Sequence, residues 1–308
     1  MSRGVKAVLA YAVQTDVAVK PLTGWKSFPR KSDSLNHKVE MTESETINGS
    51  RIKTAGLVTS ASAEGDVECE FIKGTYDDLI AAAAGNVWAG NKVSFAGDVA
   101  TMFALEKQHK DIDSGLYHYW GGMRVNTFKL DIPETGFIGL TFGFMGSGYE
   151  NGSTAYSVTP TVSPTAPKAA SITVGDIKIN GSTLKGIACI TQFSFEANNN
   201  IERQNCLGGG LYGAKLLEMM ADLSGSLTMA YGKKAQEILN NQMTGAVVSI
   251  EALINFSDGS SYTLTIPKAQ LAGDIPSGGK DKLEASLSYT VVADTIADAP
   301  YITRTLKP

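Results

Sequence analysis

The sequence contains few of the residues from which catalytic and metal sites are usually built. Its 308 residues include three histidines and three cysteines. The histidines, His37, His109 and His118, lie in no HExxH motif, and no GxSxG motif occurs. The cysteines are too widely spaced for a CxxC metal site or a disulfide framework. We therefore expect no enzymatic activity, no catalytic residue, no metal site and no cofactor.

Basic charge and long apolar runs are also scarce. The chain has 27 Lys and Arg against 31 Asp and Glu, a net charge of −4. This balance argues against a protein that binds nucleic acid tightly. No stretch reaches the roughly 20 consecutive apolar residues of a membrane helix. Arg3 and Lys6 precede a short apolar run, but Gln14 and Asp16 interrupt it, so we expect neither a signal peptide nor a membrane contact.

What the chain does contain is typical of an ordered, mainly β protein. Hydrophobic residues make up 43% and charged residues 19% of the sequence. Alternating apolar residues predict a strand over 138–144, where Ile138, Leu140, Phe142 and Phe144 share one face. The same pattern predicts strands at 36–40, 67–72, 100–106, 126–132, 189–197, 226–231, 246–255, 261–267 and 283–293.

Three segments favour helices. Residues 76–84 follow Thr75, a candidate N-cap, and end before Gly85. Residues 232–245 have apolar positions at helical spacing and end at a glycine. Residues 214–221 form a third, weaker candidate. The segment 298–308 has no apolar periodicity, which predicts a disordered tail or a contact with a neighbour.

The order of elements repeats along the chain. Each half has a strand, a polar stretch, a second strand, a helix and three further strands, and the helix starts lie about 158 positions apart. The segment 147–171 is rich in Pro, Ser and Thr and has no apolar period. We therefore expect two β domains, 1–146 and 172–308, joined by a linker or exposed arm at 147–171. Each would be an antiparallel β-sandwich or open barrel with one flanking α-helix.

Two long polar stretches, 41–65 and 198–225, occupy matched places in the two halves. Structureless loops of this length are uncommon unless they are functional or disordered. We interpret them as arms that meet a neighbouring subunit, with a solvated hairpin tip as the alternative. Their charged residues are the candidate contacts: Glu43, Glu45, Arg51 and Lys53 in the first, and Glu202, Arg203 and Lys215 in the second.

One aromatic cluster favours a different class of protein. Tyr117, Tyr119 and Trp120 precede Gly121, and such a cluster is found both at strand ends and in platforms on which sugars stack. A carbohydrate-binding or adhesin-type sandwich is therefore the alternative function.

The first half resembles the major tail tube proteins of long-tailed, non-contractile bacteriophages, in a duplicated-domain form. The resemblance begins with an early polar strand that leads into a long hairpin carrying Glu43 to Arg51. Three segments follow in order: VECEFIKGTYDDLIAAAAGNVW at 67–88, FALEKQ at 103–108 and YHYWGGMRVNTFKLDIPETGFIGLTFGFMG at 117–146. It covers nearly all of the chain if the second half is a diverged copy. The second half departs from the pattern by a Gly-rich insert at 207–213.

The resemblance implies a structural protein of the virion, made in the cytoplasm of the host bacterium. Family members form rings that stack through a long loop into a hollow tube, through which DNA passes without specific binding. Rings usually have six sectors, which implies trimers, or pseudo-hexamers, for a duplicated chain. The implied partners are further copies of the chain, the tape-measure protein and the tail terminator. Alternation makes Glu40, Glu68 and Glu70 candidates for the lumen lining, although the pattern does not separate lumen from outer surface.

Overall fold

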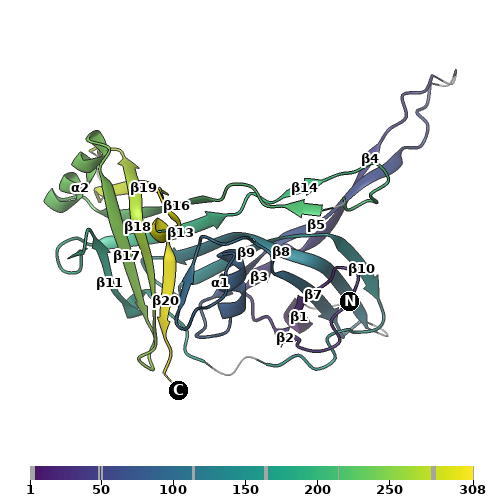
Figure 1. Cartoon of the computed structure of the whole chain (residues 1–308), viewed down its shortest axis with the longest axis horizontal. Coiled ribbons are helices and arrows are strands. Elements are labelled where there is room, and N and C mark those ends of the chain that lie inside the picture. Colours follow the sequence, from purple (N-terminus) through teal and green to yellow (C-terminus); the bar gives the residue numbers. More distant parts are fainter. Residues whose placement is uncertain are drawn as a thin grey trace.

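The computed structural model describes residues 4–47, 49, 51–112, 115–162, 166–213, 215–278 and 282–307, apart from the side chains of residues 241 and 243. The described chain is mainly β, with antiparallel strand pairing and two α-helices, and the sheets do not close into a barrel. This agrees with the predicted fold class. Figure 1 shows the second half with helix α2 at one end, the first half at the other, and a long hairpin projecting from the first half.

The first half contains ten strands and one α-helix among its described residues. In chain order they are β1 (Ala7–Gln14), β2 (Lys26–Ser27), β3 (Ser32–Asp33), β4 (Asn36–Thr42), β5 (Leu57–Glu70), α1 (Asp77–Ala83), β6 (Lys92–Ser94), β7 (Met102–His109), β8 (Leu116–Ile132), β9 (Gly139–Gly146) and β10 (Gly148–Gly152).

The second half contains ten strands and one α-helix among its described residues. In chain order they are β11 (Val174–Ile179), β12 (Ser182–Thr183), β13 (Ile190–Asn198), β14 (Glu202–Gln204), β15 (Lys215–Leu217), β16 (Asp222–Ala230), α2 (Lys233–Met243), β17 (Val247–Asn255), β18 (Ser261–Gly273), β19 (Glu284–Val291) and β20 (Tyr301–Thr305).

The two halves pair their strands in the same order. In the first half the order across the sheets is β1-β7-β8-β9-β5-β4. In the second it is β11-β17-β18-β19-β16-β13. Each of these six strands therefore has a counterpart in the other half, and α1 and α2 each follow the fifth strand of their order directly in sequence, after β5 and β16. The domain boundaries at 146 and 172 remain a prediction.

Strand β8 connects the two halves. Its residues 116–123 pair with β7, and its residues 127–132 pair with β13 of the second half. Gly122 lies near the end of the first part, where its pairing with β7 shifts register, with φ +63, and its N–H donates to Gln14 Oε1 at 2.7 Å. A Cβ at this position would lie 3.1 Å from the side chains of Ser147 and Val17. Glycine therefore allows β8 to turn from one sheet into the other.

Aromatic side chains fill the core of the first half. Phe28 packs edge-on to Tyr11, Phe142 and Phe144, and Phe128 lies 5.5 Å from Phe142 between ring centroids. All five rings are buried. Removing this area from water is the main stabilising contribution that the sandwich makes, since each fully buried ring contributes about 2 kcal/mol.

The two stronger helix predictions are confirmed as α1 and α2. Gly85 ends α1 with φ +66, as expected for a helix stop. The predicted N-cap is wrong, because Tyr76 holds that position without a side-chain cap. Thr75 lies before the helix and donates to Lys73 O at 3.5 Å.

The third helix prediction, over 214–221, is also wrong; residue 214 lies outside the described residues. Lys215–Leu217 form strand β15, which pairs with β14. Only Leu216 is buried, while Leu217, Met219 and Met220 are exposed. These apolar side chains therefore form no single helical stripe, and the backbone pairs in a hairpin instead.

Two segments expected to lack structure are ordered. Strand β20 pairs with both β18 and β6, so the predicted disordered tail is wrong for residues 301–305; residue 308 lies outside the described residues. In the segment 147–171, β10 pairs with β8. The buried Ser157 donates to the buried Glu106 at 2.6 Å. This part of the segment is therefore packed on the first half and is not an exposed arm.

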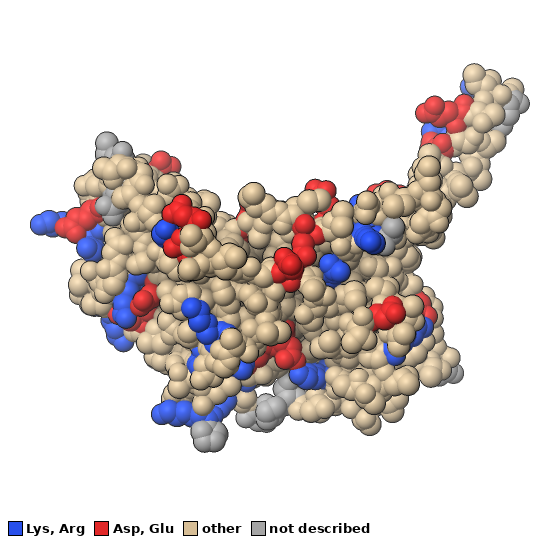
Figure 2. Space-filling model, viewed as in Figure 1, with Lys and Arg blue, Asp and Glu red and all other residues tan. Residues whose placement is uncertain are grey.

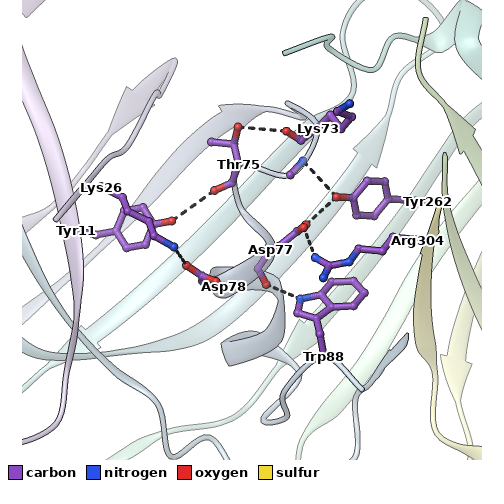
Figure 3. A network of polar contacts seen from close by, with 10 residues as sticks. Tyr11, Lys26, Lys73, Thr75, Asp77, Asp78, Trp88, Tyr262 and Arg304 are labelled. Atoms are coloured by element: carbon purple, nitrogen blue, oxygen red, sulfur yellow. Dashed lines mark hydrogen bonds and ion pairs between the residues drawn. The ribbon is translucent and has the colours of Figure 1, made fainter. Parts of the chain in front are cut away.

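A polar network joins α1 to the second half (Figure 3). The Asp77 carboxylate accepts from the Tyr262 hydroxyl at 2.8 Å and forms an ion pair with Arg304 of β20. The Arg304 guanidinium also stacks 4.0 Å over the ring of Trp88, whose Nε1 donates to Asp77 O at 2.9 Å. Burial raises the pKa of Asp77, although Tyr262 and Arg304 act in the opposite direction.

Candidate functional site

One continuous face of the sheet, running from β4 to β18, is polar and acidic. Side chains alternate along each strand, so the residues opposite the core line up across β4, β5, β9, β8, β13, β16, β19 and β18. We call this surface the polar sheet face. Its acidic residues are Glu40, Glu64, Asp66, Glu68, Glu70, Asp131, Glu196, Asp222 and Glu284, and its basic residues are Lys38, Arg124, Lys129 and Lys268.

The remaining positions of the polar sheet face are mostly small. Thr141 and Gly143 of β9 are followed across the sheet by serines and threonines of β13, β16 and β19. With nine acidic and four basic side chains, this face is negatively charged, and its excess of five carboxylates exceeds the net charge of −4 of the whole chain. Small hydroxyl side chains add no apolar or basic group to which a polyanion could adhere.

The three carboxylates proposed for the lumen all lie on the polar sheet face. Ser60 Oγ donates to Glu40 at 2.7 Å, and Ser32 Oγ donates to Glu68 at 2.7 Å. Glu70 forms an ion pair with Lys168 at 2.5 Å. Glu64 and Asp66 were not among the predicted residues, because the strand was predicted to begin at residue 67, whereas β5 begins at Leu57.

The first polar stretch is a projecting hairpin, which we call the arm: the ends of β4 and β5 and the described residues between them, 43–47, 49 and 51–56 (Figure 1). All four predicted contact residues of the arm are exposed, and Lys53 forms an ion pair with Glu43. Figure 2 shows acidic and basic side chains side by side near the end of the arm. The arm also exposes five apolar side chains: Val39, Met41, Ile47, Ile52 and Leu57.

The second polar stretch folds back onto the first half. It forms the hairpin β14–β15, in which Gln204 pairs with Lys215, and both Glu202 and Lys215 are exposed. Arg203 Nη2 donates to Gly146 O at 3.4 Å, and Leu211 O accepts from Ala61 N at 2.8 Å. Leu216 is buried with Val99 and Ile201. The structure thus brings this hairpin to the base of the arm, and the two stretches differ in conformation.

An aromatic cluster lies where this hairpin meets the arm. His37 of β4 stacks on Tyr149 at 4.6 Å between centroids and lies 5.8 Å from Tyr212. Tyr149 also forms a hydrogen bond of 2.7 Å with His118. Burial, together with His109 and Lys107, lowers the pKa of His118. No signal in the sequence pointed to this contact between residues so far apart.

Two of the three aromatic residues behind the carbohydrate alternative are buried, while Tyr117 is partly exposed. Trp120 is 3% exposed and Tyr119 5% exposed. Burial raises the pKa of Tyr119 to about 12. Both rings are core residues, so their faces are not available to stack on a sugar.

Neither a metal cluster nor a membrane-spanning helix is found in the described part of the chain. Among those residues no three His, Cys, Asp or Glu side chains lie close enough to hold a metal ion. The described helices are also too short and too polar to cross a bilayer.

Comparison with known proteins identifies the family. A family model described as phage tail tube protein matches residues 4–291, which is nearly the whole chain and includes both halves. A comparison with curated protein sequences finds no match.

Proposed function

Because this chain belongs to the phage tail tube protein family, we propose that its copies assemble into rings and that the rings stack into the hollow tube of a phage tail. A protein of this family is a structural component of the virion, and its role is self-assembly into a tube. The finer proposals below rest on particular surfaces of the chain.

We propose that the polar sheet face lines the lumen and that genome DNA passes along it. Its nine carboxylates repel phosphates, and its small hydroxyl side chains offer few contacts. A basic lining would instead bind DNA through phosphate contacts and the release of counterions. The charge of this face is the observation that carries the proposal.

The repeated strand order supports a ring of three subunits with six similar sectors. Each chain contributes two matched sets of strands, and β8 pairs with β13 between them. A closed ring is the usual solution when one interface repeats around an axis. The units 1–146 and 172–308, with the segment 147–171 between them, would be the two sectors.

The arm is the proposed contact between rings. It extends beyond the sheets and exposes both apolar and charged side chains. Isolated exposed apolar residues are common on proteins, but five on one narrow hairpin indicate a surface that becomes covered. The tape-measure protein and the tail terminator are proposed as the partners inside the tube and at its end, with synthesis in the host bacterial cytoplasm.

Electron microscopy of the purified protein over a concentration series tests this function. We expect rings or tubes with three-fold repetition. The proposal is contradicted if only monomers form under all conditions and no tube containing the protein is found in virions. The burial of Trp120 and Tyr119 argues against the carbohydrate-binding alternative.

A further inference from the structure

The counterpart strands β8 and β18 share a sequence at their C-terminal ends. Asp131 and Ile132 are the last two residues of β8, and Pro133 comes next. The same three residue types, Asp274, Ile275 and Pro276, come directly after the last residue of β18. Leu130 therefore matches Gly273, and Ile132 matches Ile275. Strand pairing supports this match, because Leu130 pairs with Leu140 of β9, and Gly273 pairs with Leu287 of β19.

In the first half, both edges of this strand end are paired. One edge of β8 pairs with β9. On its other edge, Leu130 pairs with Phe195 and Ile132 pairs with Phe193, both of β13. Ile132 is only 5% exposed as a result. This is the junction between the two halves of the chain.

In the second half, no described strand pairs with the matching edge. The pairing of β17 with β18 ends at Gln270, and Ile275 is 66% exposed. Along a strand, successive N–H groups point to opposite edges. Val292 N donates to Lys268 O, so the even-numbered residues of this part of β18 face β19, and Gly273 N–H faces the open edge.

A side chain occupies that open edge. Gln242, in the last turn of α2, accepts the Gly273 N–H through Oε1 at 2.7 Å. In the first half, the end of α1 instead contacts the incoming strand, since Asn199 Nδ2 donates to Ala83 O at 3.1 Å. The amide of Gln242 therefore substitutes for one backbone acceptor that a paired strand would provide.

The counterpart of β13 has an unpaired edge as well. In the pairing order of the first half, β4 takes the place that β13 has in the second half, and β3 pairs with β5 on the same side as β4. Among the described strands, both β3 and β4 pair only with β5. The edge through which β13 binds β8 is thus open on β3 and β4. Open sheet edges tend to pair with another chain unless they are covered.

We propose that the edge formed by β3 and β4 of one subunit pairs with the end of β18 in the next subunit, and that Gln242 caps this end until the neighbour arrives. The partner is a second copy of the chain, and the junction within the chain is the template. The inference rests on the proposed function and specifies which edges close the ring. Pairing exchanges the Gln242 hydrogen bond for backbone hydrogen bonds and covers Ile275.

The template also predicts the register. Counting back from Gly74 and Gly232, the glycines that precede the two helices, matches Asp66 with Ser224. Ser34 lies opposite Asp66, because its N–H donates to Asp66 O at 2.9 Å, and Glu196 lies opposite Ser224 in the same way. Ser34 is therefore the counterpart of Glu196. Glu196 pairs across the junction with Lys129, the counterpart of Ala272. Ser34 of one subunit should therefore lie opposite Ala272 of the next.

Disulfide cross-linking tests this register. Ser34→Cys and Ala272→Cys are combined in a background in which the exposed Cys189 and Cys206 are changed to Ser. Directly opposed residues in antiparallel strands are within disulfide distance. We expect oxidised assemblies to give covalent dimers and trimers on a non-reducing gel. The control combines Ala272→Cys with Ser62→Cys, which lies one strand further from the edge on β5, and should stay monomeric.

The two proposals fail in different ways. Tubes that form from the double variant without the Ser34–Ala272 cross-link would overturn the inference and leave the proposed function intact. Failure of the unmodified chain to form any ring or tube would overturn the proposed function itself.

Removing the cap tests the role of Gln242. Gln242→Ala leaves the Gly273 N–H without its partner in the free subunit, so we expect assembly at an about fivefold lower protein concentration. Light scattering measures this concentration. The control is Asn240→Ala, on the exposed side of the same helix, which should assemble as the unmodified chain does. An unchanged concentration for Gln242→Ala would overturn the capping role, while the cross-link tests the pairing independently.

Discussion

The Tyr262 hydroxyl donates a hydrogen bond of 2.8 Å to the Asp77 carboxylate, across 185 positions of sequence. Asp77 begins α1 in the first half, and Tyr262 lies on β18 in the second. Together with Arg304 they form a buried polar connection between the halves, in addition to the β8–β13 strand pairing. A buried carboxylate of this kind is stable only while its partners remain in place.

Removal of Arg304 should therefore destabilise the fold strongly. We expect Arg304→Ala to lower the free energy of unfolding by about 3 kcal/mol, because it leaves Asp77 buried without its cation. Tyr262→Phe, which removes one hydrogen bond, should cost about 1 kcal/mol. Urea unfolding followed by tryptophan fluorescence measures both. Thr305→Ala, an exposed change on the same strand, is the control, and equal losses for all three variants would contradict the prediction.

Asp33 should make stability depend on acid pH. Burial alone would raise its pKa, but Lys107 and Arg30, each 2.5 Å from the carboxylate, lower it below the ordinary value. The unfolded chain then binds more protons than the folded chain below about pH 4, so stability falls as pH drops through the native pKa.

Asp33→Asn tests this dependence. At pH 7 the variant should be less stable by about 3 kcal/mol, because Lys107 and Arg30 lose their partner. The difference from the unmodified chain should shrink between pH 4 and the native pKa. Urea midpoints at pH 7, 5 and 3 measure it, with Glu45→Gln on the arm as a control. A difference that stays constant with pH would contradict the assignment.

Shortening the arm should separate ring formation from stacking. Replacing residues 43–53 with an Asn-Gly turn preserves the paired part of β4 and β5 and removes the projecting end. We expect folded subunits that form rings but no tubes, as seen by electron microscopy. Lys53→Ala serves as the control, since an exposed ion pair contributes little and stacking should persist. Tubes of normal length from the shortened protein would show that the contacts between rings lie elsewhere.

Reversing charge on the polar sheet face should make the tube retain DNA. With Glu40→Lys and Glu68→Lys, we expect assembled tubes to bind short duplex DNA at low salt and to release it as salt increases. Sedimentation of tubes with labelled DNA measures retention. Glu237→Lys with Asp16→Lys, two exposed positions outside this face, is the control. Equal retention by both double variants would place the lumen on another surface.

Regular alternation made the central strands predictable. Ile138, Leu140, Phe142 and Phe144 share one buried face, as expected, because β9 has a core on one side only. Strand β1 was missed because Leu9 and Tyr11 enter one core cluster and Ala10 enters another, so both faces are apolar. Strand β20 was missed because backbone pairing and Arg304, more than apolar periodicity, hold it.

The candidate surfaces were predictable to the extent that they depend on local pattern. The common face of Glu68 and Glu70 follows from strand geometry alone. The different conformations of the two polar stretches do not follow from local pattern, because they depend on contacts between distant residues, such as that between Arg203 and Gly146. Gln242 carried no signal, since its partner at Gly273 is set by how α2 packs on β18.

The position of β20 also orders events during synthesis. Strand β6 and Asp77 belong to the first half, yet their partners, Tyr301–Thr305 and Arg304, are translated after every other strand described here. The first half cannot complete its polar network until residue 304 has left the ribosome. A chain that ended before Tyr301 would therefore lack both the β6–β20 pairing and the partner of Asp77.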